Sequence, residues 1–242
     1  MHYYDLHSWN VTPQEARVLQ DKLHTQVIKT DEFGVIKSVA GVDIGIRDNI
    51  ALASVIVLSY PDLHIVDGIV TQYQISFPYI PGILSYREIP PLLVAFAYLN
   101  TEPDLIIVDG QGIAHPRHFG LASHLGLILD KPTIGCAKSR LCGTYTEPEI
   151  EKGSYTYLMD DTEIIGAVLR TRTRVSPVYV SIGHKISLDS AIRIILDCCP
   201  KFRIPVTTRY AHKAAAGDIP TGVSYINKLH SIQSLEPILK SV

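Results

Sequence analysis

Two aspartates in apolar segments are the residues of this 242-residue sequence that are best placed to do chemistry. Asp43 lies in SVAGVDIGI, and Asp109 ends PDLIIVDG, where Gly110 permits a tight turn. An ionised carboxylate in an apolar strand is costly without a partner, so either aspartate alone fits a salt-bridged or capping role. The two together favour a shared cation, and oxygen ligands without Cys or His favour Mg²⁺ or Mn²⁺ over Zn²⁺.

The segment that follows Asp109, DGQGIAHPRHFGLASHLG, combines flexible backbone with several histidines. Three of its glycines precede the core of a predicted helix, and the backbone at a helix amino terminus suits anions such as phosphate. A plain glycine-rich turn is the structural alternative. A Walker-type phosphate loop is excluded, because the sequence lacks the GK[ST] that this loop requires.

Basic residues supply a local positive surface that the net charge of −2 conceals. Lys138 and Arg140 lie in GCAKSRLCG beside a predicted strand end. RTRTRV at 170–175 predicts a strand with a basic stripe on one face. The stripe consists of Arg170, Arg172 and Arg174. An ordinary solvated edge strand explains it about as well, but together with the acids these cations predict metal-assisted attack on a phosphodiester.

A proline-rich stretch, FPYIPGILSYREIPPL at 77–92, stands between the two aspartates. Its four prolines fix φ and remove backbone donors, which predicts a stiff segment outside any sheet or helix interior. Tyr79 gives this segment an aromatic face, and Glu88 places a carboxylate near its end. A proline-rich surface loop without a function is the simpler alternative.

The elements that must position these residues follow from hydrophobic periodicity. Thr12–Ile28 predicts an amphipathic helix, and Glu15, three residues after Thr12, predicts a capping box at its start. Strands are predicted at Ile36–Ile46, Ile50–Tyr60 and Leu63–Ile75. The short turns between these strands predict a three-stranded antiparallel meander.

The second half of the chain alternates between helical and strand patterns. Helices are predicted at Pro91–Leu99, His118–Leu129, Ser187–Cys198 (with Ser187 as cap) and, as the last one, Thr207–Ala216. Strands are predicted at Asp104–Val108, Pro132–Cys136, Glu163–Arg172 and Val178–Ile182. Such alternation predicts parallel strands joined by crossovers.

The fold class is therefore α/β, with a central mixed sheet flanked by helices. The sheet combines the antiparallel three-stranded meander with parallel strands, and a ribonuclease H-like arrangement fits the order of the elements. Because no repeat or linker interrupts the sequence, we expect one domain over residues 1–242, with a core at about 12–216 and a C-terminal tail at 217–242.

Composition narrows the kind of protein and its cellular compartment further. With 46% hydrophobic and 19% charged residues the chain is typical of globular proteins, and no apolar run reaches the ~20 residues that a membrane span requires. The amino terminus lacks a secretory signal, and the four cysteines lack the CxxC spacing of structural zinc sites. We expect a cytoplasmic protein with reduced thiols, no membrane association and a monomeric state.

In five sequence blocks that include the acidic, basic and proline-rich segments described above, the sequence resembles the endonuclease V family of deoxyinosine 3′-endonucleases. The matching blocks are GVDIG (41–45), PYIPGILSYREIPPL (78–92), PDLIIVDGQGIAHPRHFGLASHLGL (103–127), KPTIGCAKSRLCG (131–143) and YVSIGHKISLDSA (179–191). The resemblance implies a ribonuclease H-like fold and a DNA repair hydrolase. Such an enzyme cuts the second phosphodiester bond 3′ to deoxyinosine, leaving a nick with a 5′-phosphate product, and uses Mg²⁺, for which Mn²⁺ substitutes.

The resemblance also assigns roles to particular residues. It implies that Asp43, Glu88 and Asp109 form the metal site, and that Lys138 and His212 are further catalytic residues. It implies a wedge that fills the gap left by a flipped base, formed by Pro78, Tyr79, Ile80 and Pro81. It implies a base pocket lined by Gly82, Leu84, Gly110 and Gly120, with His115 close to the site.

Several points stay open at the level of sequence. Inosine-containing RNA or single-stranded DNA is an alternative substrate, and a non-catalytic inosine reader is an alternative of a different class. The family match departs at Cys136, where many members carry a β-branched apolar residue. The segment 144–165 is too acidic for a DNA-facing surface, so we expect it to lie away from the substrate.

Overall fold

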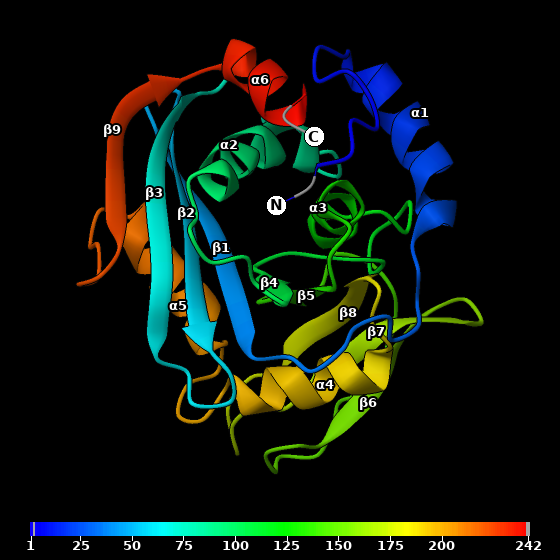
Figure 1. The fold of residues 1–242 in the computed structure, drawn as a ribbon. Coiled ribbons are helices and arrows are strands. Elements are labelled where there is room, and N and C mark those ends of the chain that lie inside the picture. Colours follow the sequence, from blue (N-terminus) through cyan, green and yellow to red (C-terminus); the bar gives the residue numbers. More distant parts are fainter. Residues whose placement is uncertain (2, 241–242) are drawn as a thin grey trace.

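A computed structural model describes residues 1 and 3–240, and in it a single twisted sheet runs through the molecule (Figure 1). The sheet has nine strands in the order β6-β7-β8-β5-β4-β1-β2-β3-β9. They are β1 (Ser38–Arg47), β2 (Ile50–Ser59), β3 (Ile65–Gln74), β4 (Leu105–Val108), β5 (Thr133–Ala137), β6 (Tyr155–Asp160), β7 (Glu163–Leu169), β8 (Val178–His184) and β9 (Ser224–His230). β1 and β4 lie at the centre, which places Asp43 and the end of β4 in the middle of the sheet.

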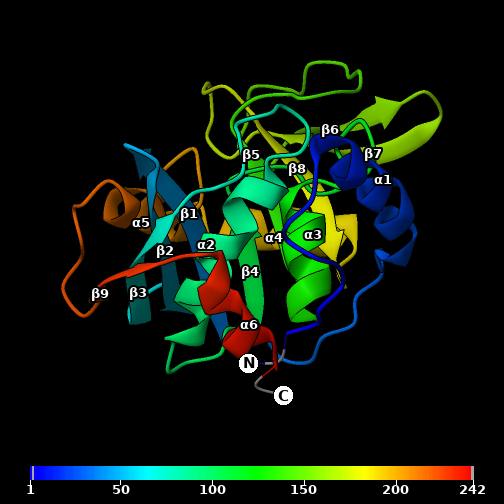
Figure 2. The same cartoon turned by 90° about the horizontal axis from the view of Figure 1, so that it is seen from above.

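Helices cover both faces of this sheet, as Figure 2 shows. The helices are α1 (Pro13–Leu23), α2 (Ser85–Ala97), α3 (Leu121–Leu129), α4 (Leu188–Asp197), α5 (Val206–Ala215) and α6 (Leu235–Lys240), with short 3₁₀ turns at His24–Gln26 and Ile232–Ser234. α2 and α3 pack on one face, whereas α4 and α5 pack on the other, with α5 against β1 and β2. The mixed sheet flanked by helices confirms the predicted ribonuclease H-like class.

The predicted meander is confirmed. β1 pairs antiparallel with β2, and β2 pairs antiparallel with β3. The predicted parallel strands are also present, because β4 pairs parallel with β1 and with β5. The helix caps follow the sequence as well: Thr12 and Glu15 form the capping box of α1, and the Ser187 side chain caps α4.

The prediction for the proline-rich stretch is wrong in its second half. The helix expected at Pro91–Leu99 begins at Ser85, so that Pro90 and Pro91 lie inside it. Two prolines remove two backbone donors from the helix. Burial compensates, since Ile89 and Leu93 on the same helix are fully buried. Tertiary packing thus overrides the local preference, and only the first half of the stretch forms a loop.

The predicted basic stripe at 170–175 is also wrong. β7 ends at Leu169, and residues 170–175 form an irregular turn in which Arg174 has a φ of 60°. Arg170 is buried and forms an ion pair with Glu147 at 2.7 Å, while Arg172 and Arg174 are exposed. Alternating residue types predicted one face of a strand, but a buried guanidinium needs a partner, and Glu147 comes from a distant loop.

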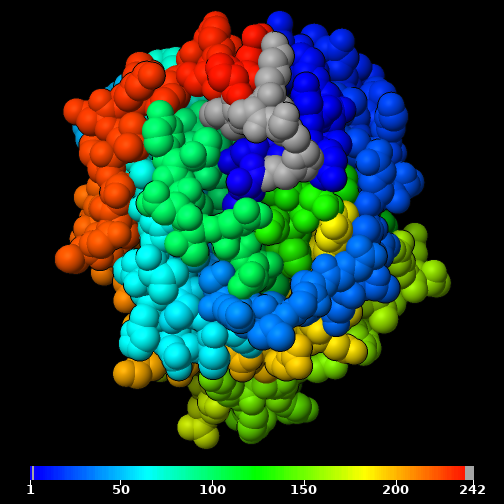
Figure 3. Space-filling model, viewed as in Figure 1, coloured from blue at the N-terminus to red at the C-terminus, as the bar shows by residue number. Residues whose placement is uncertain are grey.

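Two strands that the sequence did not predict extend the sheet on both sides. β6, within the acidic segment 144–165, forms one edge, and β9 forms the other by pairing parallel with β3. Thr207–Ala216 is therefore not the last helix, because α6 follows β9. α3 begins three residues later than predicted, since His118 adopts a φ of 47°. In Figure 3 the N-terminal and C-terminal segments, blue and red, border the same side of the molecule.

Within the described part of the chain, every helix is too short or too polar to cross a lipid bilayer.

Candidate active site

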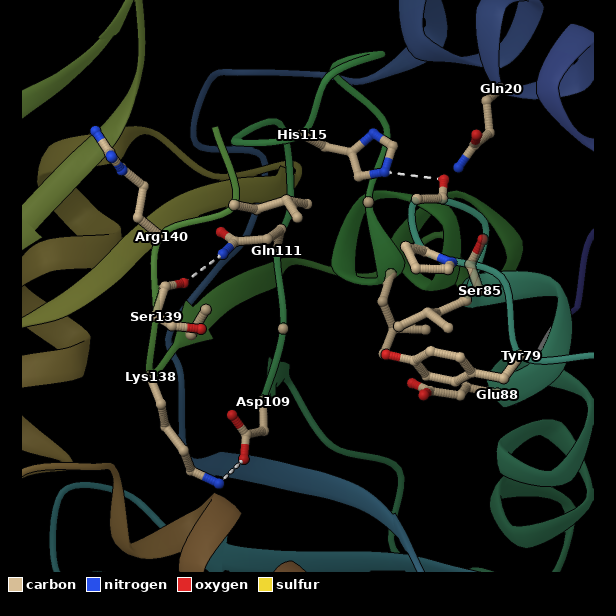
Figure 4. Close-up of a pocket in the computed structure, with 18 residues that line it drawn as sticks. Gln20, Tyr79, Ser85, Glu88, Asp109, Gln111, His115, Lys138, Ser139 and Arg140 are labelled. Atoms are coloured by element: carbon tan, nitrogen blue, oxygen red, sulfur yellow. Dashed lines mark hydrogen bonds and ion pairs between the residues drawn. The ribbon is translucent and has the colours of Figure 1, made fainter. Parts of the chain in front are cut away.

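A cavity of about 380 Å³ opens between the first turn of α2, the start of α3 and the ends of β4 and β5 (Figure 4). Its walls come from four segments that are far apart in the sequence. They contribute Gln20; Tyr79, Pro81, Gly82, Leu84, Ser85 and Glu88; Asp109, Gly110, Gln111, His115, Gly120 and Leu121; and Ala137, Lys138, Ser139, Arg140 and Leu141. The carboxyl ends of parallel strands are where open α/β sheets place their ligands, and this cavity occupies that position.

The two aspartates stand side by side at the sheet centre. Val42 and Val108 are partners in the parallel β1–β4 ladder, so Asp43 and Asp109 follow neighbouring positions on adjacent strands. Both side chains are mostly buried, with exposed fractions of 20% and 16%. The apolar strands around them hold the two carboxylates close together in surroundings where charge is expensive.

Each aspartate pairs with a different basic side chain. Lys138, just after β5, forms a short ion pair with Asp109 through its Nζ (Figure 4). His212 on α5 meets Asp43, with 2.8 Å between Nδ1 and Oδ2. A charge-assisted contact of this kind is among the stronger hydrogen bonds of a protein. The two carboxylates thus contact basic side chains from different elements, one that directly follows β5 and one on α5.

Two glycines of β1 allow α5 to approach Asp43. A Cβ at Gly41 would lie 2.2 Å from the backbone of Thr207, and one at Gly45 would lie 2.3 Å from the carbonyl oxygen of Ala215. Both separations are impossible for real atoms, so α5 packs directly on the strand only because these positions lack side chains. This close packing brings His212, which lies between Thr207 and Ala215, to Asp43.

Glu88, which lies on α2, is the third carboxylate of a group with Asp43 and Asp109. Burial, together with the negative charges of Asp43 and, to a smaller extent, Asp109, raises the pKa of Glu88 to about 7, against the opposing effect of Arg87. Like charges held close in a partly buried site disfavour ionisation of one member. A cation would relieve this repulsion.

The donor set therefore fits a hard divalent cation, although its present arrangement does not form a ligand cage. Among the residues that the structure describes, no three His, Cys, Asp or Glu side chains converge closely enough to hold an ion. The aspartates face Lys138 and His212 instead. Three oxygen donors without a sulfur ligand match Mg²⁺ or Mn²⁺, and Asp43, Glu88 and Asp109 are the residues that would hold such an ion.

Comparison with known proteins decides the family. A family model for endonuclease V matches residues 21–213. This chain belongs to the endonuclease V family. The endonuclease V of Roseiflexus sp. is 50% identical over 213 residues, which cover 88% of this chain and 96% of that protein. The endonuclease V of Nostoc sp. is 52% identical over 219 residues, or 89% and 99% of the two chains.

Solved structures of endonuclease V share the fold. That from Streptomyces avermitilis has a TM-score of 0.83 at 41% identity and covers 87% of this chain and 94% of its own. Endonuclease V from Ciona intestinalis, in complex with a 24mer DNA that contains an inosine followed by a ribo-adenosine, has a TM-score of 0.76 at 29% identity, with coverage of 85% and 96%. The classification of this chain as a nuclease is thereby confirmed.

In this chain, the loop at 77–84 presents an exposed tip on an anchored base. Tyr79 is 68% exposed, while Phe77 is buried and its carbonyl accepts a hydrogen bond of 2.6 Å from Arg87 Nη1. Gly82 has a φ of 82°, a conformation that favours glycine. The loop is therefore held at both ends with an aromatic ring at its tip.

The carbonyl of Gly82 is fixed by two side chains from the segment after β4. His115 Nε2 lies 3.0 Å from it, and Arg117 Nη2 donates to it at 2.9 Å. Arg117 Nε donates in turn to Gln20 on α1, at 2.7 Å. Burial and the Arg117 charge lower the pKa of His115 to about 4, so this imidazole is neutral near pH 7 and donates to Gly82 through Nε2–H.

A buried hydrogen-bonded chain supports the first turn of α2 from behind. Ser85 Oγ lies 3.0 Å from His124 Nδ1, and His124 Nε2 lies 2.7 Å from His7 Nε2. Burial lowers the pKa of both histidines. The turn that carries Glu88 and lines the cavity is thus tied to α3 and to the N-terminal segment.

The structure gathers most of the residues expected from the sequence. Those that line the cavity are Tyr79, Pro81, Gly82, Leu84, Glu88, Asp109, Gly110, His115, Gly120 and Lys138. Asp43 and His212 lie beside it on the α5 side. Pro78 is exposed at the loop tip, and Ile80 packs against the cluster of Phe77, Ile83 and Tyr86 below the loop rather than lining the cavity.

Sequence reasoning missed two glutamines of the cavity wall. Gln20 lies on the buried face of α1 with Ala16 and Leu23, so its helical spacing was a signal that a polar side chain faces the interior. Gln111 is buried and donates to the carbonyl of Ser139 at 3.1 Å. Its amide oxygen has no partner among the described residues. Nothing in its local sequence, between two glycines, indicated this role.

Proposed function

We propose that this chain is a divalent-metal-dependent endonuclease that recognises deoxyinosine in DNA. It hydrolyses the second phosphodiester bond 3′ to the lesion and leaves a nick with a 5′-phosphate. The observation that carries the proposal is the grouping of Asp43, Glu88 and Asp109 beside a base-sized cavity, with Lys138 at its rim. The inosine-containing DNA bound by the Ciona relative supports the choice of lesion.

The carboxylates are proposed as the metal ligands. Asp43 and Asp109 would hold Mg²⁺ directly, and Glu88 would complete the site directly or through water; Mn²⁺ fits the same oxygen donors. Such a cation, when bound, lowers the pKa of a coordinated water and neutralises charge on the transition state. Released from Asp109, the ammonium of Lys138 would contact a phosphate oxygen and stabilise the charge that develops there. His212 would position Asp43 and assist proton transfer.

The loop at 77–84 is proposed as the lesion reader. Tyr79 would stack in the gap left when the inosine leaves the duplex, at a flipping cost of a few kcal/mol. Pro78, Ile80 and Pro81 would stiffen this wedge. The extruded base would enter the cavity between Leu84, Gly110 and Gly120, where Gly82 is held in place by His115.

The experiment is a cleavage assay on a labelled duplex. With deoxyinosine and Mg²⁺ we expect a single nick, one nucleotide beyond the lesion on its 3′ side, and a ligatable 5′-phosphate. A matched duplex with adenine in place of inosine and a reaction with EDTA serve as controls. Failure of the wild-type protein to cut the inosine strand under enzyme excess would overturn the proposal.

RNA is the second candidate substrate. The bound DNA of the Ciona relative carries a ribo-adenosine after the inosine, so that family member accommodates a 2′-hydroxyl next to the lesion. Comparing rates on DNA, RNA and single strands with the same inosine sequence ranks the substrates. A non-catalytic reader would bind inosine strands without metal-dependent turnover in any of these assays.

We further propose that the enzyme acts as a monomer in the cytoplasm, as a single catalytic domain. Four segments of a single chain line the cavity, which supports a site built within one copy. Sedimentation at the concentrations of the cleavage assay tests the monomer.

A further inference from the structure

An exposed aromatic residue and an arginine form a stacked pair outside the cavity. Phe202, in the turn between α4 and α5, is 40% exposed. The guanidinium of Arg209 on α5 lies 3.8 Å from the centre of its ring. A stacked guanidinium is weakly hydrated and presents a flat cationic surface. We call these two residues the Phe202–Arg209 platform.

The platform is close to the catalytic residues. Arg209 precedes His212 by three residues, or about 4.5 Å along the helix axis and nearly one turn. His212 contacts Asp43, so α5 leads from the acids to Arg209. Phe202 is next to Arg203, whose Nη2 donates to the carbonyl oxygen of Lys138 at 2.6 Å. The turn that carries Phe202 is thus fastened to the backbone of the predicted catalytic lysine.

Arg203 also makes this turn rigid. Its Nε donates to the carbonyl of Ser176 at 2.9 Å, and Nη2 donates to that of Pro177 at 2.8 Å. Thr171 bonds to the carbonyl of Arg203. The segment 170–177, which carries the arginines that sequence alone placed on a strand, is therefore packed against the turn with Phe202.

Unpaired positive charges lie next to the platform. Lys201 and Arg172 are exposed, and neither takes part in an ion pair within residues 1 and 3–240. Free cations on a surface attract a polyanion because contact with phosphates releases condensed counterions. A flat aromatic and guanidinium surface among such cations has the composition of a single-strand binding platform.

We propose that the Phe202–Arg209 platform binds the nucleic-acid strand on the 3′ side of the bond that is cut. This inference rests on the proposed function. The lesion cavity lies on the α2 and α3 face of the sheet, and the acids stand at the sheet centre. A strand that places its inosine in the cavity and its 3′ phosphates at the acids continues over the α5 face. There Arg209 and Phe202 meet the next nucleotides.

The test measures binding without catalysis, in EDTA, by fluorescence anisotropy. One inosine oligonucleotide ends just beyond the scissile bond, and another continues for about ten nucleotides on the 3′ side, a length within the range of single-strand sites. We expect Phe202→Ala and Arg209→Gln each to weaken binding of the long strand about 10-fold and to leave the short strand unchanged. Arg209→Gln also lowers the slope of log K against log[salt] by about 1, and Phe202→Ala does not.

Matched variants separate stacking from charge and from folding. Phe202→Leu keeps the apolar contact without the flat ring, and Arg209→Lys keeps the charge without the planar group, so both should lose part of the affinity. Lys22→Gln removes an exposed charge from α1, across the molecule from α5 (Figure 1), and should change nothing. Unchanged thermal unfolding confirms that the platform variants are folded.

Three results would overturn the proposed role of the platform. The variants could lose equal affinity for the short and long strands, lose affinity only for strands with a 5′ extension, or lose no affinity. The proposed function fails separately. If the wild-type protein binds the long strand through the platform but does not cut inosine DNA with Mg²⁺, the function is wrong and the surface stands. If the wild-type protein cuts inosine DNA and the platform variants bind the long strand normally, the proposed function stands and the platform is wrong.

Discussion

Asp43 and Asp109 occupy equivalent places on neighbouring parallel strands, yet their partners differ in kind. Asp109 pairs with Lys138, which follows the next strand of the same sheet. Asp43 pairs with His212, which a helix brings from 169 residues away and which is 62% exposed. The difference shows that the Asp109–Lys138 pair follows from the order of the strands alone. The Asp43–His212 pair depends also on the close packing of α5 against β1.

The largest expected effect comes from removing either aspartate. Asp43→Ala and Asp109→Ala should each lower cleavage of inosine DNA by more than about 100-fold, because each removes a proposed metal ligand. Binding of the inosine strand in EDTA should persist. Single-turnover rates and anisotropy measure the two quantities. Retention of metal-dependent cleavage in either variant would contradict the proposed site.

The partners should differ in importance. Lys138→Met should reduce the single-turnover rate about 100-fold, since a cation next to the reacting phosphate is lost. His212→Gln should cost only about 10-fold, because water can reach its exposed position and Asp43 remains. Lys138→Arg should recover part of the rate. Equal losses at the two positions would show that the exposed histidine takes as direct a part as the lysine.

Tyr79 tests whether recognition is separable from both aspartate pairs. Tyr79→Ala should weaken binding of inosine duplex about 10-fold by loss of stacking and leave the metal concentration needed for half-maximal cleavage unchanged. Tyr157→Ala, which removes an exposed ring from the β6 edge, is the control. Unaltered cleavage of limiting inosine substrate by Tyr79→Ala would count against the wedge.

The smallest expected effect is on the stability of the protein. It reports how strongly the negative charges of the two aspartates act on Glu88. The pKa of Glu88 is raised to about 7 in the folded protein. Without metal, the folded state therefore holds a proton that the unfolded state has lost, and stability should fall as pH rises from about 4.5 to 7. The change is at most about 3 kcal/mol, or a decrease of several degrees in the unfolding midpoint.

Glu88→Gln should remove this pH dependence, as thermal unfolding in EDTA will measure. Asp43 raises the Glu88 pKa more than Asp109 does. Asp43→Asn should therefore flatten the profile more than Asp109→Asn. The opposite order would mean that Asp109, although it is paired with Lys138, raises the pKa of Glu88 more than Asp43 does.

Local sequence patterns predicted the elements that depend only on near neighbours. The capping box of Thr12, the Ser187 cap and the three meander strands all follow from spacing and residue type, and all are present. The same reasoning failed where distant contacts decide. Pro90 sits in a helix because that helix is buried, and Arg170 leaves its strand because Glu147 binds it.

The sequence by itself determined the two apolar strands that carry Asp43 and Asp109, because alternation, turn residues and an isolated charge are local signals. Only the tertiary structure decided which groups meet these carboxylates. His212 reaches Asp43 because Gly41 and Gly45 lack side chains. Phe202 reaches Arg209 through a turn that is fixed by distant carbonyls. Such contacts depend on packing across the sheet, which no short window of residues encodes.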